Sequence, residues 1–320
     1  MKRIMLLFLA VLLIAGCVNL PWGAPRDELE MVPQAANALI IFRPSSTLND
    51  SDFASLYNSS EQMSFEISRI AATTGIDPAK IDRMVLFFNF DSFTQESETY
   101  GGFVASGVIE KENILEKMKL NNIITELKYG SSTIYEITSR ELPENKTYLS
   151  FLGGMLVGGS RKAVEDSIDL SNGKGVSVKS RKNLMKAYDE LGKDSVFLFL
   201  MESTPQMRKE INETQQQLFS IRPLSRMQSV GFSIEKKGKA VDLKLLTLAD
   251  DAASAADISD LFNSSVSIGK TLAGEGSAAR DVLSKIRVRA NGNEVSVLLS
   301  SDMDELGKLN DELSQMASPE

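Results

Sequence analysis

Few side chains in this sequence are of the types that commonly carry out acid–base, nucleophilic or metal chemistry. The chain of 320 residues contains no histidine and one cysteine, Cys17. Without histidine it lacks the usual general base at neutral pH, the commonest metal ligand and every Ser-His or Cys-His dyad. A single cysteine forms neither an intrachain disulfide nor a thiolate metal site. We therefore expect no metal site, no cofactor and no enzymatic activity.

Ser171 and Lys174 have the Ser-x-x-Lys spacing of a serine nucleophile with a lysine base. That chemistry requires both side chains on the first turn of a helix, inside an apolar pocket. In this sequence the pair lies in a polar, Gly-rich stretch, and so short a pattern arises often by chance. The sequence therefore favours a surface turn over a nucleophile.

The segment Gly158-Gly159-Ser160 invites comparison with phosphate-binding loops. Such a loop ends in Lys-Ser/Thr, whereas Ser160-Arg161-Lys162 stands at that point of this sequence. An anion at a helix N-terminus remains an alternative. The favoured interpretation is a hairpin followed by an ordinary helix N-cap.

Two acidic stretches are candidates for carboxylate chemistry, and their members are Asp250, Asp251, Asp257, Asp260, Asp302, Asp304 and Glu305. Neither stretch has the alternate-oxygen spacing and central glycine of a calcium loop. Acidic residues at the start of a helix stabilise it as caps and through the helix dipole, which is the role we expect. Paired carboxylates for glycosidic chemistry stay open, because such pairs need not be close in sequence.

The N-terminus has the three-part layout of a secretory leader. Met1-Lys2-Arg3 is basic, Ile4–Ala15 is uninterruptedly apolar, and small residues precede Cys17. The apolar run of about 12 residues is shorter than the ~20 that a membrane-spanning helix requires. We therefore expect a signal peptide over residues 1–16.

Leu13-Ile14-Ala15-Gly16-Cys17 resembles the lipobox of prokaryotic lipoproteins. The resemblance covers residues 1–17 only. It implies that the Cys17 sulfur carries a diacylglyceryl group and that the mature chain begins at Cys17, and two acyl chains suffice for stable anchoring. Residues 17–35, interrupted by Pro21, Gly23, Pro25 and Pro33, then read as a lipid-anchored tether. The alternatives are a plain leader with a coincidental cysteine or an uncleaved anchor helix.

Sequons of the Asn-x-Ser/Thr type predict surface positions that could carry sugars in a host with the machinery for it. The candidate glycosylation residues are Asn49, Asn58, Asn145, Asn212 and Asn263.

The rest of the chain alternates short apolar strands with amphipathic helices. Ala38–Phe42, Met84–Phe90 and Gly101–Gly107 predict strands, and spacing by threes and fours predicts a helix over 52–74. Hairpin turns are expected at Tyr129–Ser132, Gly153-Gly154, Lys236–Lys239 and Asn291-Gly292. Hairpins mixed with packing helices indicate an α+β fold and not a doubly wound parallel sheet.

The stretch Asn172–Ser180 is rich in Gly, Lys and Ser and poor in apolar residues, which marks it as a domain boundary. We expect two α+β domains, at residues 36–172 and 180–318. Each should be an antiparallel sheet with helices packed on one face.

The charge balance is acidic. The formal net charge is −8, and removal of Lys2 and Arg3 with a leader makes it −10 (−8 − 2). That charge disfavours nucleic acid and anionic lipid surfaces as partners.

The leading hypothesis is a non-enzymatic lipoprotein of the cell surface or periplasm. Its partners would be the membrane, through the lipid on Cys17, and an envelope protein, peptide or glycan. One alternative is an extracytoplasmic hydrolase that uses carboxylates, or Ser and Lys, without histidine. Another is an assembly component that recruits a partner along a sheet edge.

Overall fold

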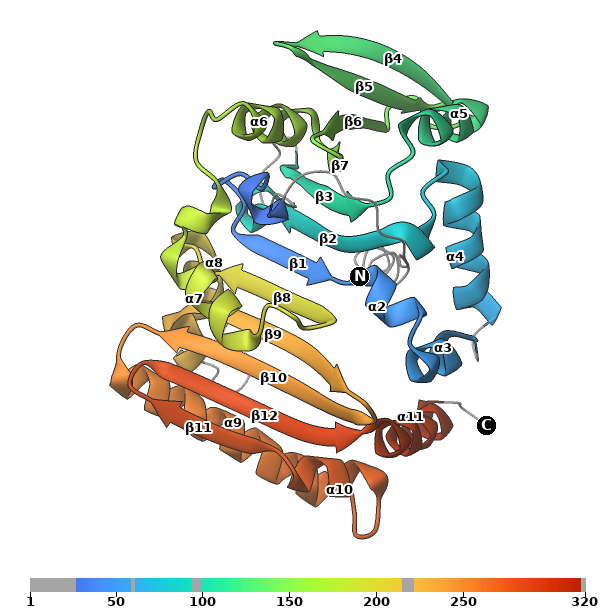
Figure 1. The fold of residues 1–320 in the computed structure, drawn as a ribbon. Coiled ribbons are helices and arrows are strands. Elements are labelled where there is room, and N and C mark those ends of the chain that lie inside the picture. Colours follow the sequence, from blue (N-terminus) through green and yellow to red (C-terminus); the bar gives the residue numbers. More distant parts are fainter. Residues whose placement is uncertain (1–26, 59–60, 94–98, 215–221, 318–320) are drawn as a thin grey trace. The chain divides into compact units, whose positions relative to one another are not determined.

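The chain is described by a computed structural model over residues 27–58, 61–93, 99–214 and 222–317 (Figure 1). It divides into two compact units. Unit 1 ends at Arg181 and unit 2 begins at Lys182. Cys17, the predicted signal peptide and residues 17–26 of the predicted tether lie outside the described residues.

Unit 1 contains an antiparallel sheet with the strand order β1-β2-β3-β7-β6-β5-β4. Its strands are β1 (Ala38–Phe42), β2 (Ile81–Phe88), β3 (Gly101–Gly107), β4 (Asn122–Tyr129), β5 (Ser132–Ser139), β6 (Lys146–Leu152) and β7 (Met155–Gly159). After the β4–β5 and β5–β6 hairpins the chain returns, so that β7 lies between β6 and β3. The strand β4 therefore forms one end of this order.

The helices of unit 1 connect or flank these strands. They are α2 (Pro44–Leu48), α3 (Ser51–Asn58), α4 (Glu61–Thr74), α5 (Lys111–Asn121) and α6 (Arg161–Ser171). Short 3-10 turns are η1 (Glu28–Glu30), η2 (Pro78–Lys80), η3 (Phe90–Phe93) and η4 (Val178–Ser180). The single helix expected over 52–74 is thus two helices, α3 and α4.

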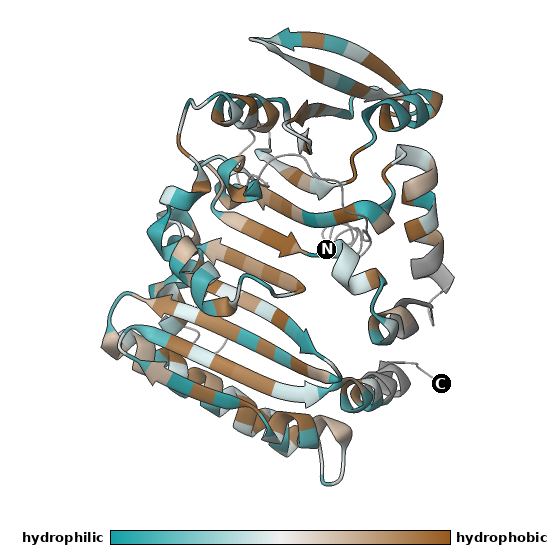
Figure 2. Ribbon diagram, in the orientation of Figure 1, coloured by the Kyte–Doolittle hydropathy of each residue, from teal (hydrophilic) through white to brown (hydrophobic). Residues whose placement is uncertain are grey.

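A row of buried side chains crosses the centre of the unit 1 sheet. Ile41, Val85, Val104 and Val157 lie directly opposite one another on β1, β2, β3 and β7, and all are at most 3% exposed. Directly opposite residues of a sheet share one face, so this row marks the apolar, buried face of the unit 1 sheet. Figure 2 shows β1 as a nearly continuous hydrophobic band, and all five of its residues are buried.

Unit 2 contains an antiparallel sheet with the order β11-β12-β10-β9-β8. Its strands are β8 (Phe197–Glu202), β9 (Met227–Lys237), β10 (Ala240–Ala249), β11 (Arg287–Asn291) and β12 (Glu294–Asp302). Its helices are α7 (Lys182–Leu191), α8 (Pro205–Thr214), α9 (Ala252–Leu272), α10 (Ala278–Ser284) and α11 (Met303–Ala317), with the 3-10 turn η5 (Arg222–Arg226).

The helices α7 and α9 lie on opposite faces of the unit 2 sheet (Figure 1). Leu191 of α7 approaches Gly231, which pairs with Leu246, whereas α9 packs on Val295, which pairs with Thr247. Neighbouring residues of a strand point to opposite faces, so positions 246 and 247 separate the two helices. The predicted α+β class with antiparallel strands is confirmed. Helices cover both faces here, because the second half of β10 is apolar on both, with Leu246 and Leu248 on one face and Leu245 and Ala249 on the other.

The predicted tether is too long. Residues 27–35 belong to unit 1, because Leu29, Met31 and Val32 are at most 2% exposed and Asp27 caps the turn η1. This short apolar group has no helical or strand period, which is why the sequence resembles a linker there. The predicted boundary stretch Asn172–Ser180 lies at the end of unit 1, and its Val178 is fully buried.

Candidate functional site

A cluster of polar side chains lies where the described chain begins. Arg83 on β2 and Ser106 on β3 are directly opposite each other. Each lies two residues along its strand from Val85 or Val104, and therefore on the same face as the buried apolar row. On β2 and β3 this face presents the cation of Arg83 and the hydroxyl of Ser106 beside the apolar side chains of Val85 and Val104.

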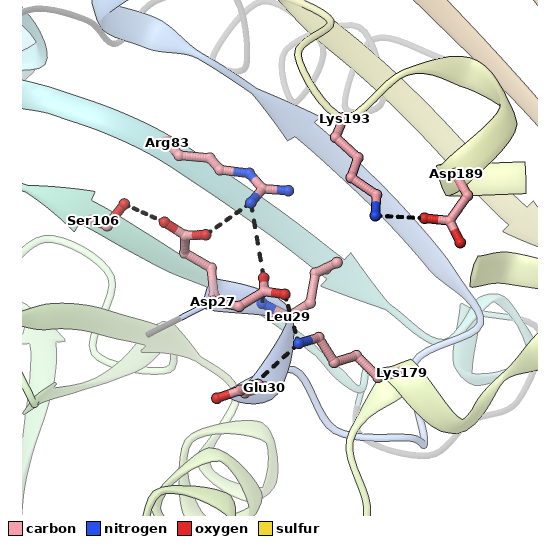
Figure 3. Close-up of polar contacts among 9 residues, drawn as sticks. Asp27, Leu29, Glu30, Arg83, Ser106, Lys179, Asp189 and Lys193 are labelled. Atoms are coloured by element: carbon pink, nitrogen blue, oxygen red, sulfur yellow. Dashed lines mark hydrogen bonds and ion pairs between the residues drawn. The ribbon is translucent and has the colours of Figure 1, made fainter. Parts of the chain in front are cut away.

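Glu28 of the turn η1 meets both groups (Figure 3). Its Oε2 accepts a hydrogen bond from Arg83 Nη1 at 3.0 Å, and its Oε1 accepts one from the Ser106 hydroxyl. The side chains of Arg83 and Glu28 are 13% and 9% exposed. A carboxylate so far from water requires both partners, since an unpaired buried charge is costly.

Asp27 and Lys179 extend this arrangement toward solvent. Asp27 Oδ1 accepts from the backbone N–H of Leu29 at 3.0 Å and lies 3.8 Å from Arg83 Nη1. Lys179 Nζ lies 2.6 Å from Asp27 Oδ2 and 3.2 Å from Glu30 Oε1. Partial burial lowers the pKa of Lys179, but its hydrogen bonds with Asp27 and Glu30 outweigh that effect and raise the pKa above its ordinary value.

Backbone pairing completes the contact between the two ends of unit 1. Val178 N–H donates to the Val32 carbonyl at 2.8 Å, and Gln34 N–H donates to the Val176 carbonyl at 2.9 Å. Arg181 Nε donates to the Gln34 carbonyl at 2.7 Å. We call the polar side chains of this region the N-terminal clamp, and its members are Asp27, Glu28, Glu30, Arg83, Ser106 and Lys179.

The clamp is suited to holding a segment in place and not to proton transfer. Each of its three carboxylates, on Asp27, Glu28 and Glu30, has a partner among Arg83, Lys179 and Ser106, although three negative charges face two positive ones. Its effect is to fix Asp27 on the sheet, ten residues after Cys17 (27 − 17 = 10).

A second polar cluster lies on β5, β6 and α6. Lys146 Nζ donates to Glu136 Oε1 at 2.9 Å, and Arg161 Nε pairs with Glu165 Oε1 at 2.8 Å. The hydrogen bond from Lys146 lowers the pKa of Glu136. A glycosidic pair requires one carboxyl group that stays protonated, which a lowered pKa opposes. This cluster therefore gives no support to the carboxylate hydrolase.

Ser171 and Gly159, members of the other nucleophile and anion candidates, make local structural contacts. The Ser171 hydroxyl donates to the Ile168 carbonyl of its own helix at 2.7 Å, and Lys174 is exposed. Gly159 packs against β3, where an added Cβ would lie 2.3 Å from the Gly101 carbonyl oxygen. The glycines of this segment therefore permit close approach of two strands.

One residue of each acidic stretch caps a helix, as the sequence indicates. Asp251 accepts from the Ser254 backbone N–H at 2.7 Å at the start of α9. Asp302 accepts from the Glu305 backbone N–H at 2.9 Å at the start of α11. Among the described residues, no group of three or more Cys, Asp or Glu side chains is arranged to hold a metal ion.

The sequons fall on different kinds of structure, and their use stays a prediction. Asn145 is exposed at the turn between β5 and β6. Asn212 and Asn263 are exposed within helices α8 and α9. Asn49 follows α2 as its C-cap, and Asn58 is the last residue of α3.

The N-terminal clamp was not predicted from the sequence. Its members come from positions as distant as Asp27 and Lys179, which only the folded sheet brings together. One signal was available: an Asp at a helix cap position, followed by Leu29, Met31 and Val32, is unusual for a free linker.

No protein-family model matches the chain. An uncharacterised protein of Methanocaldococcus jannaschii, MJ0635, is 25% identical over 203 residues, which are 60% of this chain. The match spans 65% of that protein, somewhat less than two thirds of its length.

Solved structures of TP0453 are distantly similar. Crystal form III has a TM-score of 0.49 at 11% identity, covering 89% of this chain and 97% of that one. Crystal form IV has a TM-score of 0.47 at 12% identity, covering 88% and 96%. At these values the similarity does not identify a function. Among the described residues, no helix is both long and apolar enough to cross a membrane.

Proposed function

We propose that this chain is a lipoprotein, exported across a membrane and held on its outer face by a diacylglyceryl group on Cys17. One observation carries the proposal: a basic start, a short apolar run and small residues precede the only cysteine of the chain, in the order that a lipobox requires. Two acyl chains would make the attachment stable.

The N-terminal clamp supports this proposal because it holds Asp27 and Glu28, which follow Cys17 closely in sequence, against the sheet of unit 1. Nine residues lie between Cys17 and Asp27, and the ten Cα–Cα steps from one to the other (27 − 17 = 10) span at most about 36 Å when fully extended. A lipid on Cys17 would therefore keep the start of unit 1 within that distance of the membrane surface.

The protein then acts by binding an envelope protein, peptide or glycan, and not by catalysis. In support of this, two of the candidate residues have structural roles. The Ser171 hydroxyl donates to the Ile168 carbonyl of its own helix, and Gly159 allows two strands to pack closely. Glu136 is held by Lys146 with a lowered pKa.

The test is membrane fractionation of the full chain beside a Cys17→Ala variant, with Ser171→Ala as a matched control. We expect the wild type and Ser171→Ala to pellet with membranes and to be digested by protease added outside the cells. Cys17→Ala should leave the membrane fraction or keep its leader. Equal partitioning of all three proteins, with the leader removed from each, would contradict a lipid on Cys17.

A further inference from the structure

The strand β4 ends the sheet of unit 1 with a long regular edge. It pairs with β5 over eight consecutive residue pairs, from Asn122↔Ser139 to Tyr129↔Ser132, without a bulge. It contains no proline, and Glu126 and Lys128 are exposed. In the described part of the chain its other side has no strand partner (Figure 1). Such an edge is a template for another strand unless something blocks it.

The hairpin geometry shows which backbone groups face the open edge. Gly130 and Ser131 form a two-residue turn, and Gly130 has φ 59°. The flanking residues Tyr129 and Ser132 are then a hydrogen-bonded pair. Because this pattern alternates, Leu127 and Thr125 also direct their N–H and C=O groups to β5. The backbone groups of Ile124, Glu126 and Lys128 point away from it.

When two copies of β4 are paired antiparallel, one register places opposite charges of the two copies across from each other. With a two-fold axis at Leu127, Glu126 of each copy lies opposite Lys128 of the other copy. Both residues belong to the set whose backbone groups face outward, so the pairing is also allowed by hydrogen bonding. Within the described contacts Lys128 Nζ bonds only to the neutral hydroxyl of Thr133, at 3.0 Å.

Neighbouring allowed registers lose this match. An axis at Glu126 sets the two copies of that carboxylate against each other and places Ile124 opposite Lys128. An axis at Lys128 sets two ammonium groups against each other. Like charges directly opposite are destabilising, whereas opposite charges are favourable.

We propose that β4 pairs with β4 of a second copy of this chain, antiparallel and centred on Leu127. The pairing joins two unit 1 sheets edge to edge, with two Glu126–Lys128 contacts that set the register. It does not depend on lipid attachment at Cys17, so it stands or falls separately from the proposed anchoring.

Cysteine crosslinking tests the register directly. In the full chain with Cys17→Ala, an introduced Leu127→Cys is the only cysteine, and at the axis its Cα lies ~4.5–5.5 Å from its counterpart, within disulfide range. The matched control Thr125→Cys would lie roughly 13 Å from its counterpart. We expect an oxidised dimer for Leu127→Cys alone. Crosslinking of Thr125→Cys instead, or of neither variant, would overturn the proposed register.

Charge exchange tests the same contact without altering the half-buried Leu127. Lys128→Glu and Glu126→Lys should each weaken dimerisation about tenfold in Kd, because two symmetry-related pairs become repulsive. The double variant Glu126→Lys/Lys128→Glu should restore the wild-type Kd, measured by analytical ultracentrifugation. A monomeric wild type, or a double variant no tighter than the single ones, would show that these charges only protect the edge.

Discussion

At the scale of single residues, the main feature is a carboxylate held away from water. Glu28 is 9% exposed and bonds to Arg83 and Ser106. Removing one partner of a buried ion pair costs far more than the pair contributes, because the other charge remains buried. The contact between Glu28 and Arg83 therefore favours this docked position of residues 27–34 over positions that would leave one of the two charges buried and unpaired.

We expect Arg83→Met to lower the free energy of unfolding by roughly 3 kcal/mol, because Glu28 keeps its buried charge without its cation. The double variant Arg83→Met/Glu28→Met should recover most of the loss. Urea unfolding followed by circular dichroism measures both. Lys80→Met is the control: its ion pairs with Asp77 and Glu110 are exposed, so its effect should stay within about 1 kcal/mol. A double variant as unstable as Arg83→Met would refute this interpretation.

Lys179 should make the clamp sensitive to alkaline pH. Its pKa is raised in the folded chain from the ordinary value of 10.5. A raised pKa contributes stability that is complete below the unfolded value and is lost as pH rises through the folded value. The difference in urea midpoint between wild type and Lys179→Gln should be constant from neutral pH to near 10.5 and shrink above it. A difference that persists unchanged above that pH would mean that the ammonium charge is not what matters.

At the scale of elements, local signals in the sequence found most strands and turns. The predicted strands Ala38–Phe42 and Gly101–Gly107 coincide with β1 and β3, and glycine-containing turns separate β4 from β5 and β6 from β7. The return of β7 to β3 was not predictable, because strand pairing between distant segments depends on the whole sheet. The N-terminal clamp was missed for the same reason.

Packing of α7 on the unit 2 sheet depends on the absence of a side chain at Gly231. An added Cβ there would lie 2.4 Å from Leu191 Cδ1 and 2.9 Å from Leu200 Cδ2. We expect Gly231→Ala to destabilise the chain by about 1–3 kcal/mol through overpacking.

Gly307→Ala is the matched control for Gly231→Ala. Gly307 lies within α11, and an added Cβ meets nothing within 4 Å. Alanine in a helix is favoured over glycine, so this change should stabilise by roughly 0.5–1 kcal/mol. Thermal unfolding of both variants decides the matter: equal shifts in Tm would mean that contact with Leu191 and Leu200 does not limit position 231.

At the scale of the whole molecule, the clamp changes the length of the proposed tether. The sequence alone placed its end at residue 35, which is 18 residues after Cys17 (35 − 17 = 18), whereas the structure has a docked chain from Asp27. The proposed tether is thus shortened to residues 17–26. With the proposed lipid on Cys17, this length would favour partners that lie near the membrane surface.

The intact mass of the mature protein, extracted from membranes, tests the central claim most directly. We expect a chain that begins at Cys17 and carries the added mass of a diacylglyceryl group, with neither feature in Cys17→Ala. A wild-type mass that retains Met1–Gly16, or that shows an unmodified Cys17 in the membrane fraction, would contradict lipid anchoring and require a different means of attachment.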